Sequence, residues 1–123
     1  MTKARETSES ARQAKAWVNF QGNTPGRTAG SSVTIRKSFN VSSVTWHGTG
    51  DFSVNFEDSM DSSDYCVIAY GNGPVYPGAH TLPFTNYIRN NYSAGSVAVA
   101  WFVTTSSNTR ADPTYGWVVV YDE

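Results

Sequence analysis

Leucine is nearly absent from this sequence, since Leu82 is the only one among 123 residues. Leucine is a common core residue of helices, so its scarcity argues against a helical bundle. Cysteine is equally rare, and the single Cys66 excludes an internal disulfide and any zinc site built from several cysteines. Histidine occurs only as His47 and His80, and neither lies in a recognised catalytic motif such as G-x-S-x-G.

Charge and long apolar stretches are also scarce. Charged residues make up 15% of the chain, well below the ~25% of an average globular protein. The net charge of −1 gives no electrostatic reason to expect a nucleic acid or an anionic membrane as partner. No apolar run approaches the ~18 residues of a membrane helix, and the first residues lack the apolar core of a secretory signal. We therefore expect neither a nucleic-acid partner nor membrane insertion.

The abundant residues are those of β-structure. The chain contains 13 Val, 13 Thr, 15 Ser, 7 Tyr and 4 Trp, and valine, threonine and aromatic side chains suit a pleated, half-buried surface. About seven apolar runs recur at the ~8–12-residue spacing of a sandwich or barrel. The sequence predicts an antiparallel β-sandwich domain over residues 16–123, preceded by an N-terminal arm over residues 1–15.

Alternating side chains define the clearest strands. The segment AWVNFQ places Val18 and Phe20 on one face and polar or aromatic residues on the other. A break near Asn40 separates two later strands. In residues 42–56, two alternating runs flank HGTGD, which predicts a β-hairpin with a short glycine turn.

Residues 64–71, DYCVIAYG, are almost continuously apolar. Such a run predicts a central strand buried on both faces, and we expect Cys66 to be an inert core thiol there. Strong strand patterns follow in SVAVAWFV and GWVVVYD. Residues 71–95 hold three of the five prolines and are expected to be irregular or built from short strands.

The N-terminal arm carries four of the nine basic residues, namely Lys3, Arg5, Arg12 and Lys15. Arg5 and Glu9 are four residues apart, which can support a short helix. A segment this short and polar is marginal as a helix by itself. Two interpretations stay open: a frayed terminus, or an anchoring arm that orders against a partner or against another copy of the chain.

Four acidic residues lie close together after the hairpin, namely Glu57, Asp58, Asp61 and Asp64. We interpret them as a solvated turn. A cation site is the alternative, although the spacing matches no EF-hand loop. No metal or other cofactor is expected from any pattern in the chain.

The segment 71–95 places ring-bearing side chains among glycine, proline and asparagine, namely Tyr76, His80, Phe84, Tyr87 and Tyr92. Aromatic residues on a loop offer rigid contact area and lose little side-chain entropy on binding. They are candidate receptor contacts. The alternative is that they fold back and cover an end of the sandwich.

Two motifs, AWVNF at residues 16–20 and TIRKSFNVSSVTWHGTGDFSVNF at residues 34–56, carry a resemblance to a known family. They resemble the small C-terminal β-domain of tailed-phage tail fibre and tailspike proteins. Met60, Tyr65 and the closing segment DPTYGWVVVYD fall at matching places, so the match covers residues 16–70 well and 96–123 loosely. The resemblance implies a trimeric, non-enzymatic module at the end of a virion appendage.

On this basis we expect a phage virion structural protein, made in the host cytoplasm and carried on the virion. A homotrimer would attach to other virion proteins through the N-terminal arm. Its loops would bind host surface polysaccharide or protein, with several weak contacts adding up to durable attachment. A purely structural decoration or cement protein of the capsid or tail, and a carbohydrate-active enzyme, are the alternatives.

Overall fold

The computed structural model describes residues 13–23, 27–72, 81–84, 92–103 and 110–122. Their regular structure is entirely β, in two four-stranded antiparallel sheets, which confirms the predicted all-β sandwich. The strands are β1 (Ala16–Gln21), β2 (Thr34–Phe39), β3 (Val41–Gly48), β4 (Asp51–Phe56), β5 (Cys66–Asn72), β6 (Thr81–Phe84), β7 (Ser96–Val103) and β8 (Tyr115–Tyr121). Within these ranges, no helix is long and apolar enough to cross a membrane.

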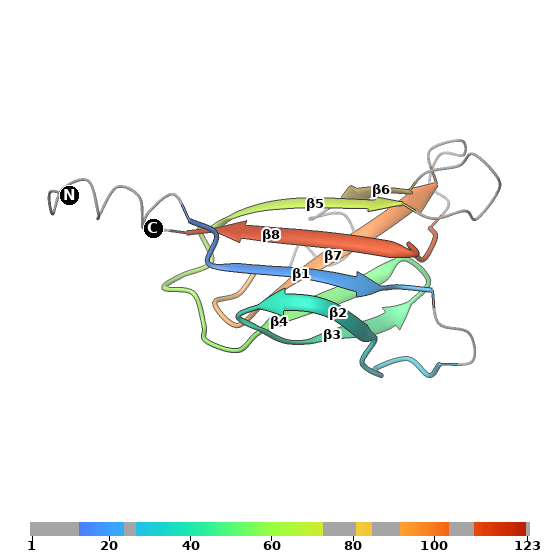
Figure 1. The fold of residues 1–123 in the computed structure, drawn as a ribbon, viewed down its shortest axis with the longest axis horizontal. Coiled ribbons are helices and arrows are strands. Elements are labelled where there is room, and N and C mark those ends of the chain that lie inside the picture. The colour runs from blue at the N-terminus through green and yellow to red at the C-terminus, as the bar shows by residue number, and fades with distance from the viewer. Residues whose placement is uncertain (1–12, 24–26, 73–80, 85–91, 104–109, 123) are drawn as a thin grey trace, which may run out of the picture.

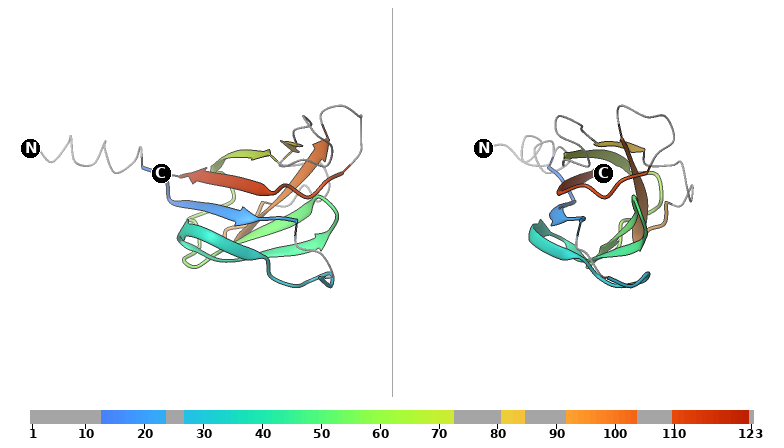
Figure 2. Two further views of the ribbon diagram at one scale, coloured as in Figure 1. Left: turned by 45° about the vertical axis from the view of Figure 1, so that its right-hand side comes forward. Right: turned by 90° about the vertical axis from the view of Figure 1, so that its right-hand side faces the viewer.

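The two sheets lie face to face around one core (Figures 1 and 2). Sheet A has the strand order β2-β1-β8-β5, and sheet B has the order β3-β4-β7-β6. The alternation predicted for the first strand is confirmed, because Val18 and Phe20 are buried between the sheets. Since neighbouring residues of a strand point to opposite faces, Trp17 and Asn19 lie on the outside of sheet A.

Three rings form the centre of the core. Phe20 lies 5.2 Å from Phe52 and 5.6 Å from Trp101, measured between ring centroids, and the last two rings are 5.4 Å apart. Tilted and edge-to-face contacts of this kind stabilise a core beyond the area they bury. Gly116 on β8 leaves room for this cluster, because a Cβ atom there would lie 2.5 Å from the Phe20 ring.

The predicted hairpin is confirmed. Gly48 pairs with Asp51, so Thr49 and Gly50 form a two-residue turn. Gly50 adopts a φ of 70°, which favours glycine, and a Cβ atom at this position would lie 2.6 Å from the Trp101 carbonyl oxygen. The predicted break near Asn40 is also confirmed, because that residue joins β2 to β3 with a φ of 55°.

The prediction for β5 is wrong. This strand lies at the edge of sheet A, and in the described part of the chain it pairs with β8 alone. Cys66, Ile68 and Tyr70 point outward and are exposed, so Cys66 is not a core thiol. The run is apolar throughout because its outer face is apolar as well as its inner face. The short strand β6 agrees with the prediction of short strands in residues 71–95.

The sandwich has two different ends. Ala16 pairs with Val120, so the start of β1 and the end of β8 lie together at what we call the terminal end. At the opposite, distal end, β1 and β5 finish at Gln21 and Asn72, and the turn after Gly48 joins β3 to β4. Figure 1 shows this polarity along the long axis of the molecule.

Candidate functional site

The outer surface of sheet A is aromatic and exposed; we call it the aromatic face. The five large hydrophobic side chains that are exposed in the described part of the chain all belong to it. They are Phe39 (54% exposed), Ile68 (57%), Tyr70 (53%), Tyr115 (40%) and Tyr121 (38%). Hydrophobic residues scattered singly over a surface need no explanation, whereas a contiguous exposed patch marks an interaction site.

Strand register arranges this face in rows across the sheet. In the first row, Trp17 of β1 pairs with Phe39 on one side and Val119 on the other, and Val119 pairs with Ile68 of β5. The row is therefore apolar from one edge of the sheet to the other. Trp17 and Val119 are half-buried between the two more exposed edge residues.

The second row differs in character. Asn19 pairs with Lys37 of β2 and with Trp117 of β8, and Trp117 pairs with Tyr70 of β5. One edge of this row carries a cation and the other carries aromatic rings. The Tyr70 and Trp117 rings stack at 5.5 Å between centroids with an interplanar angle of 29°.

The stack continues along β8 toward the distal end. Tyr115 lies 5.7 Å from Trp117 with the rings 15° apart, and the Arg36 guanidinium lies 4.0 Å from the Tyr115 ring centroid. Arg36 also donates to the carbonyl oxygens of Phe20 (2.6 Å) and Thr114 (2.8 Å). A cation held over a ring face attracts it electrostatically. Tyr115 is thereby held in place although it is exposed.

The half of the outer face of sheet B that β3 and β4 form has the opposite character. Asn55 donates to the hydroxyls of Ser43 and Thr45, both at 3.0 Å. His47 and Ser53 are hydrogen-bonded at 2.8 Å between Nε2 and Oγ. These small polar side chains satisfy one another and can face water, so the two outer faces of one sandwich present different surfaces.

A largely buried ion pair joins three segments at the distal end; we call this group the Asp112 clamp. Asp112 accepts hydrogen bonds from the Gly50 backbone (2.7 Å) and from Trp46 Nε1 (3.1 Å), and it pairs with Arg27 at 2.8 Å. The Arg27 side chain is only 7% exposed; it lies 4.5 Å from the Trp46 ring centroid and donates to the Gly22 carbonyl oxygen. The clamp fixes the hairpin turn to the chain that follows β1.

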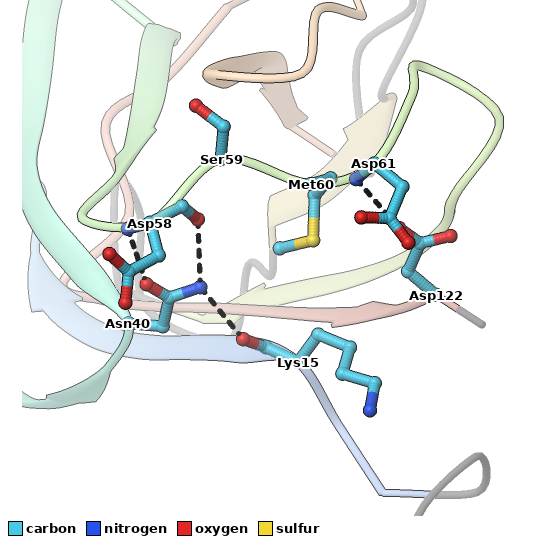
Figure 3. Close-up of a pocket in the computed structure, with 7 residues that line it drawn as sticks. All are labelled: Lys15, Asn40, Asp58, Ser59, Met60, Asp61 and Asp122. Atoms are coloured by element: carbon cyan, nitrogen blue, oxygen red, sulfur yellow. Dashed lines mark hydrogen bonds between the residues drawn. The ribbon is translucent and has the colours of Figure 1, made fainter.

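An open pocket lies at the terminal end (Figure 3). Asn40 donates to the carbonyl oxygens of Lys15 (3.0 Å) and Asp58 (3.1 Å), and it accepts from the Asp58 backbone at 2.7 Å. Asp122 accepts from the Asp61 backbone at 3.4 Å. Through Asn40, these hydrogen bonds connect the residue before β1 to the acidic turn.

The four acidic residues predicted to form a solvated turn are all exposed, as expected: Glu57, Asp58, Asp61 and Asp64. Among the described residues, no group of three or more His, Cys, Asp or Glu side chains is arranged to hold a metal ion. Of the predicted anchoring residues, Lys15 lines the pocket. Lys3, Arg5 and Arg12 lie outside the described residues.

Tyr92 is the one predicted receptor contact whose side chain is described. It is half-buried and meets Tyr65 edge-on at 5.7 Å, and Tyr65 meets Phe56 in the same way. The Tyr65 hydroxyl donates to the carbonyl oxygens of Ser93 (2.8 Å) and Ser96 (2.9 Å), and burial raises its pKa to about 12. Tyr92 thus packs back onto the sandwich, as the alternative interpretation of residues 71–95 expects.

The other predicted receptor contacts stay predictions. Phe84 lies in β6, whereas Tyr76, His80 and Tyr87 lie outside the described residues. The sequence interpretation did not locate the aromatic face. Its signal was present in YGWVVVY and CVIAYG, where both alternating sets of residues are apolar or aromatic.

No family model, no curated protein and no solved structure matches this chain. The site must therefore be interpreted from its own geometry. The aromatic face offers planar rings and one cationic edge, which suits binding to another surface.

Proposed function

We propose that this chain is a binding and assembly module of a phage virion, which works as a homotrimer and carries out no catalysis. The single observation that carries the proposal is the contrast between the two outer faces of the sandwich. Sheet A exposes large rings, whereas the β3–β4 half of sheet B carries small polar groups that are already hydrogen-bonded to each other. An exposed aromatic face on one side of a small domain is typical of an interaction surface.

The two ends of the sandwich support two separate roles, anchoring at the terminal end and receptor binding at the distal end. β1 begins at Ala16 at the terminal end, so an N-terminal arm that precedes it is well placed to anchor the module to other virion proteins. β5 and β7 finish at Asn72 and Val103, so the chain leaves them at the distal end. Residues 73–80 follow β5 in the sequence and include two of the predicted receptor contacts, Tyr76 and His80. The proposed ligand is host surface polysaccharide or protein.

Adsorption of phage particles to host cells tests the receptor role. Replacing Tyr76 and Tyr87 together with alanine should reduce adsorption, while the module still folds and is incorporated. Replacing Ser53 with alanine on the outer face of sheet B is the matched control. Normal adsorption of particles that carry the double variant would refute this contact surface.

Deletion of residues 2–14 tests the anchoring role. The β-domain should keep its circular dichroism spectrum, because β1, its first core strand, begins only at Ala16, and it should disappear from purified particles. If the shortened chain is incorporated normally, the arm is not the anchor.

A purely structural decoration protein is the second candidate, since the same aromatic face would serve assembly without a receptor. Normal adsorption by the tyrosine double variant, combined with loss of particle integrity when the module is deleted, would favour it. The enzymatic alternative predicts cleavage of host polysaccharide that depends on His47, the histidine bonded to Ser53. We expect no cleavage in a depolymerase assay.

A further inference from the structure

The aromatic face is large enough to be a subunit interface. A large side chain buries ~150–250 Å², so five that are about half exposed leave roughly 500 Å² of mainly apolar surface. Trp17, Trp117 and Val119 are half-buried in the same rows and add to this area. A stable interface needs about 800 Å² from each partner. The face therefore approaches the requirement without any rearrangement of the sandwich.

The two edges of this face complement each other. The β2 edge carries Phe39 in the first row and Lys37 in the second, and the β5 edge carries Ile68 and Tyr70 in the same two rows. If the β2 edge of one copy meets the β5 edge of another, Phe39 packs on Ile68 and Lys37 approaches the Tyr70 ring. Both are favourable contacts, one hydrophobic and one between a cation and an aromatic ring.

Charge opposes the other pairing. Lys37 lies on the β2 edge, so two β2 edges in contact would bring like charges together. The exposed acids Asp61 and Asp64 precede β5, which gives that side of the molecule the opposite sign. We propose that a second copy of this chain covers the aromatic face, with its β5 edge against the β2 edge of the first.

This inference rests on the proposed assembly function and names the surface that performs it. A rotation axis parallel to the strands brings the β2 edge of one copy against the β5 edge of the next. Each strand then runs in the same direction as the same strand in every other copy. Every copy then presents its terminal end on one side and its distal end on the other. That geometry lets all N-terminal arms of an assembly reach the same virion surface.

Solution mass tests the inference first. The wild-type chain should have a light-scattering mass of at least twice the 13.4 kDa of one chain. Ile68→Lys should reduce this to the mass of one chain, because it places a cation in the apolar row. Ser42→Lys, which adds the same charge on an exposed position of the edge strand β3, should leave the assembly unchanged. Circular dichroism checks that both variants keep their β-structure.

Cys66 provides a second readout, because this single cysteine lies on the same face. A soluble maleimide should label the wild-type assembly slowly and the Ile68→Lys variant rapidly. Equal labelling rates in the two proteins would contradict burial of the face.

Cross-linking tests the pairing of edges. In a Cys66→Ser background, chains with Phe39→Cys are mixed with chains with Ile68→Cys and oxidised. Covalent pairs should contain one chain of each kind, and neither variant should cross-link alone. A chain with both substitutions should cross-link to the full size of the assembly. Cross-links between two Phe39→Cys chains would overturn the proposed pairing.

The outcomes separate this inference from the proposed function. If wild type is an assembly that Ile68→Lys leaves intact, the copies meet elsewhere, and the inference fails while the assembly function survives. A wild-type chain that is monomeric at all concentrations refutes both the inference and the homotrimer. If such a monomer bound host polysaccharide and Tyr70→Ala weakened that binding, the face would be a ligand platform instead.

Discussion

Removal of the Asp112 carboxylate should destabilise the fold more than most single substitutions. In the Asp112→Ala variant, Arg27 would keep its buried charge without an ionic partner, and the Gly50 and Trp46 donors would lose their acceptor. Breaking a buried ion pair by removing one partner costs about 3–5 kcal/mol. For a domain of this size, such a loss lowers Tm by about 10–20 °C.

Three further variants separate the contributions of charge and hydrogen bonding. Asp112→Asn keeps an oxygen acceptor for Gly50 but removes the charge, so it should cost less than Asp112→Ala. Arg27→Met removes the cation and keeps the apolar contact with Trp46. The combination of Arg27→Met with Asp112→Asn should then cost less than the sum of the two single changes, because no buried charge is left unpaired.

Urea unfolding followed by tryptophan fluorescence measures these differences. The midpoint should fall in the order wild type, Asp112→Asn, Asp112→Ala, with an unchanged slope m. A stability of Asp112→Ala within about 0.5 kcal/mol of wild type, the usual range for a surface substitution, would refute the clamp as a stabilising element.

Two further predictions concern the core. Because burial raises the pKa of Tyr65 to about 12, from ~10 in the unfolded chain, its contribution to stability should be complete below pH 10. It should be lost as the pH rises from 10 toward 12, and Tyr65→Phe should remove this part of the pH dependence of urea unfolding. Gly116→Ala should lower stability by about 1–3 kcal/mol, since its Cβ would overlap the buried Phe20 ring. Phe20→Leu in the same chain should recover part of this loss, and an unchanged midpoint for Gly116→Ala would contradict the tight packing.

The sequence predicted those parts of the fold that depend on neighbouring residues. The hairpin around Gly50 needs a short turn and two alternating arms, and both are visible in consecutive residues. The strand with Val18 and Phe20 has one apolar and one mixed face, so its inward side was evident. In each case, the information lies within about ten residues of the chain.

The position of β5 could not be predicted in the same way. A strand that is apolar on both faces is typical of the middle of a sheet, and CVIAYGN has that pattern. Whether such a strand lies inside or at an edge depends on the order in which distant strands pair. Here β8 pairs with both β1 and β5, so β5 becomes the edge, and residues that would have been core become exposed surface.

The error at β5 and the aromatic face have one physical cause. The inward residues of β8, Val118 and Val120, already fill the space between the sheets, so Trp117 and Val119 are not needed for the core of a single chain. An apolar outer face lowers solubility and adds nothing to the inner core, so it needs a role outside the isolated domain. In the assembly that we propose, a second copy provides that role, because the hydrophobic surface that one chain cannot bury is buried between chains. The apolar run of β5 then has the same explanation as in a central strand, except that its outer neighbour belongs to another molecule.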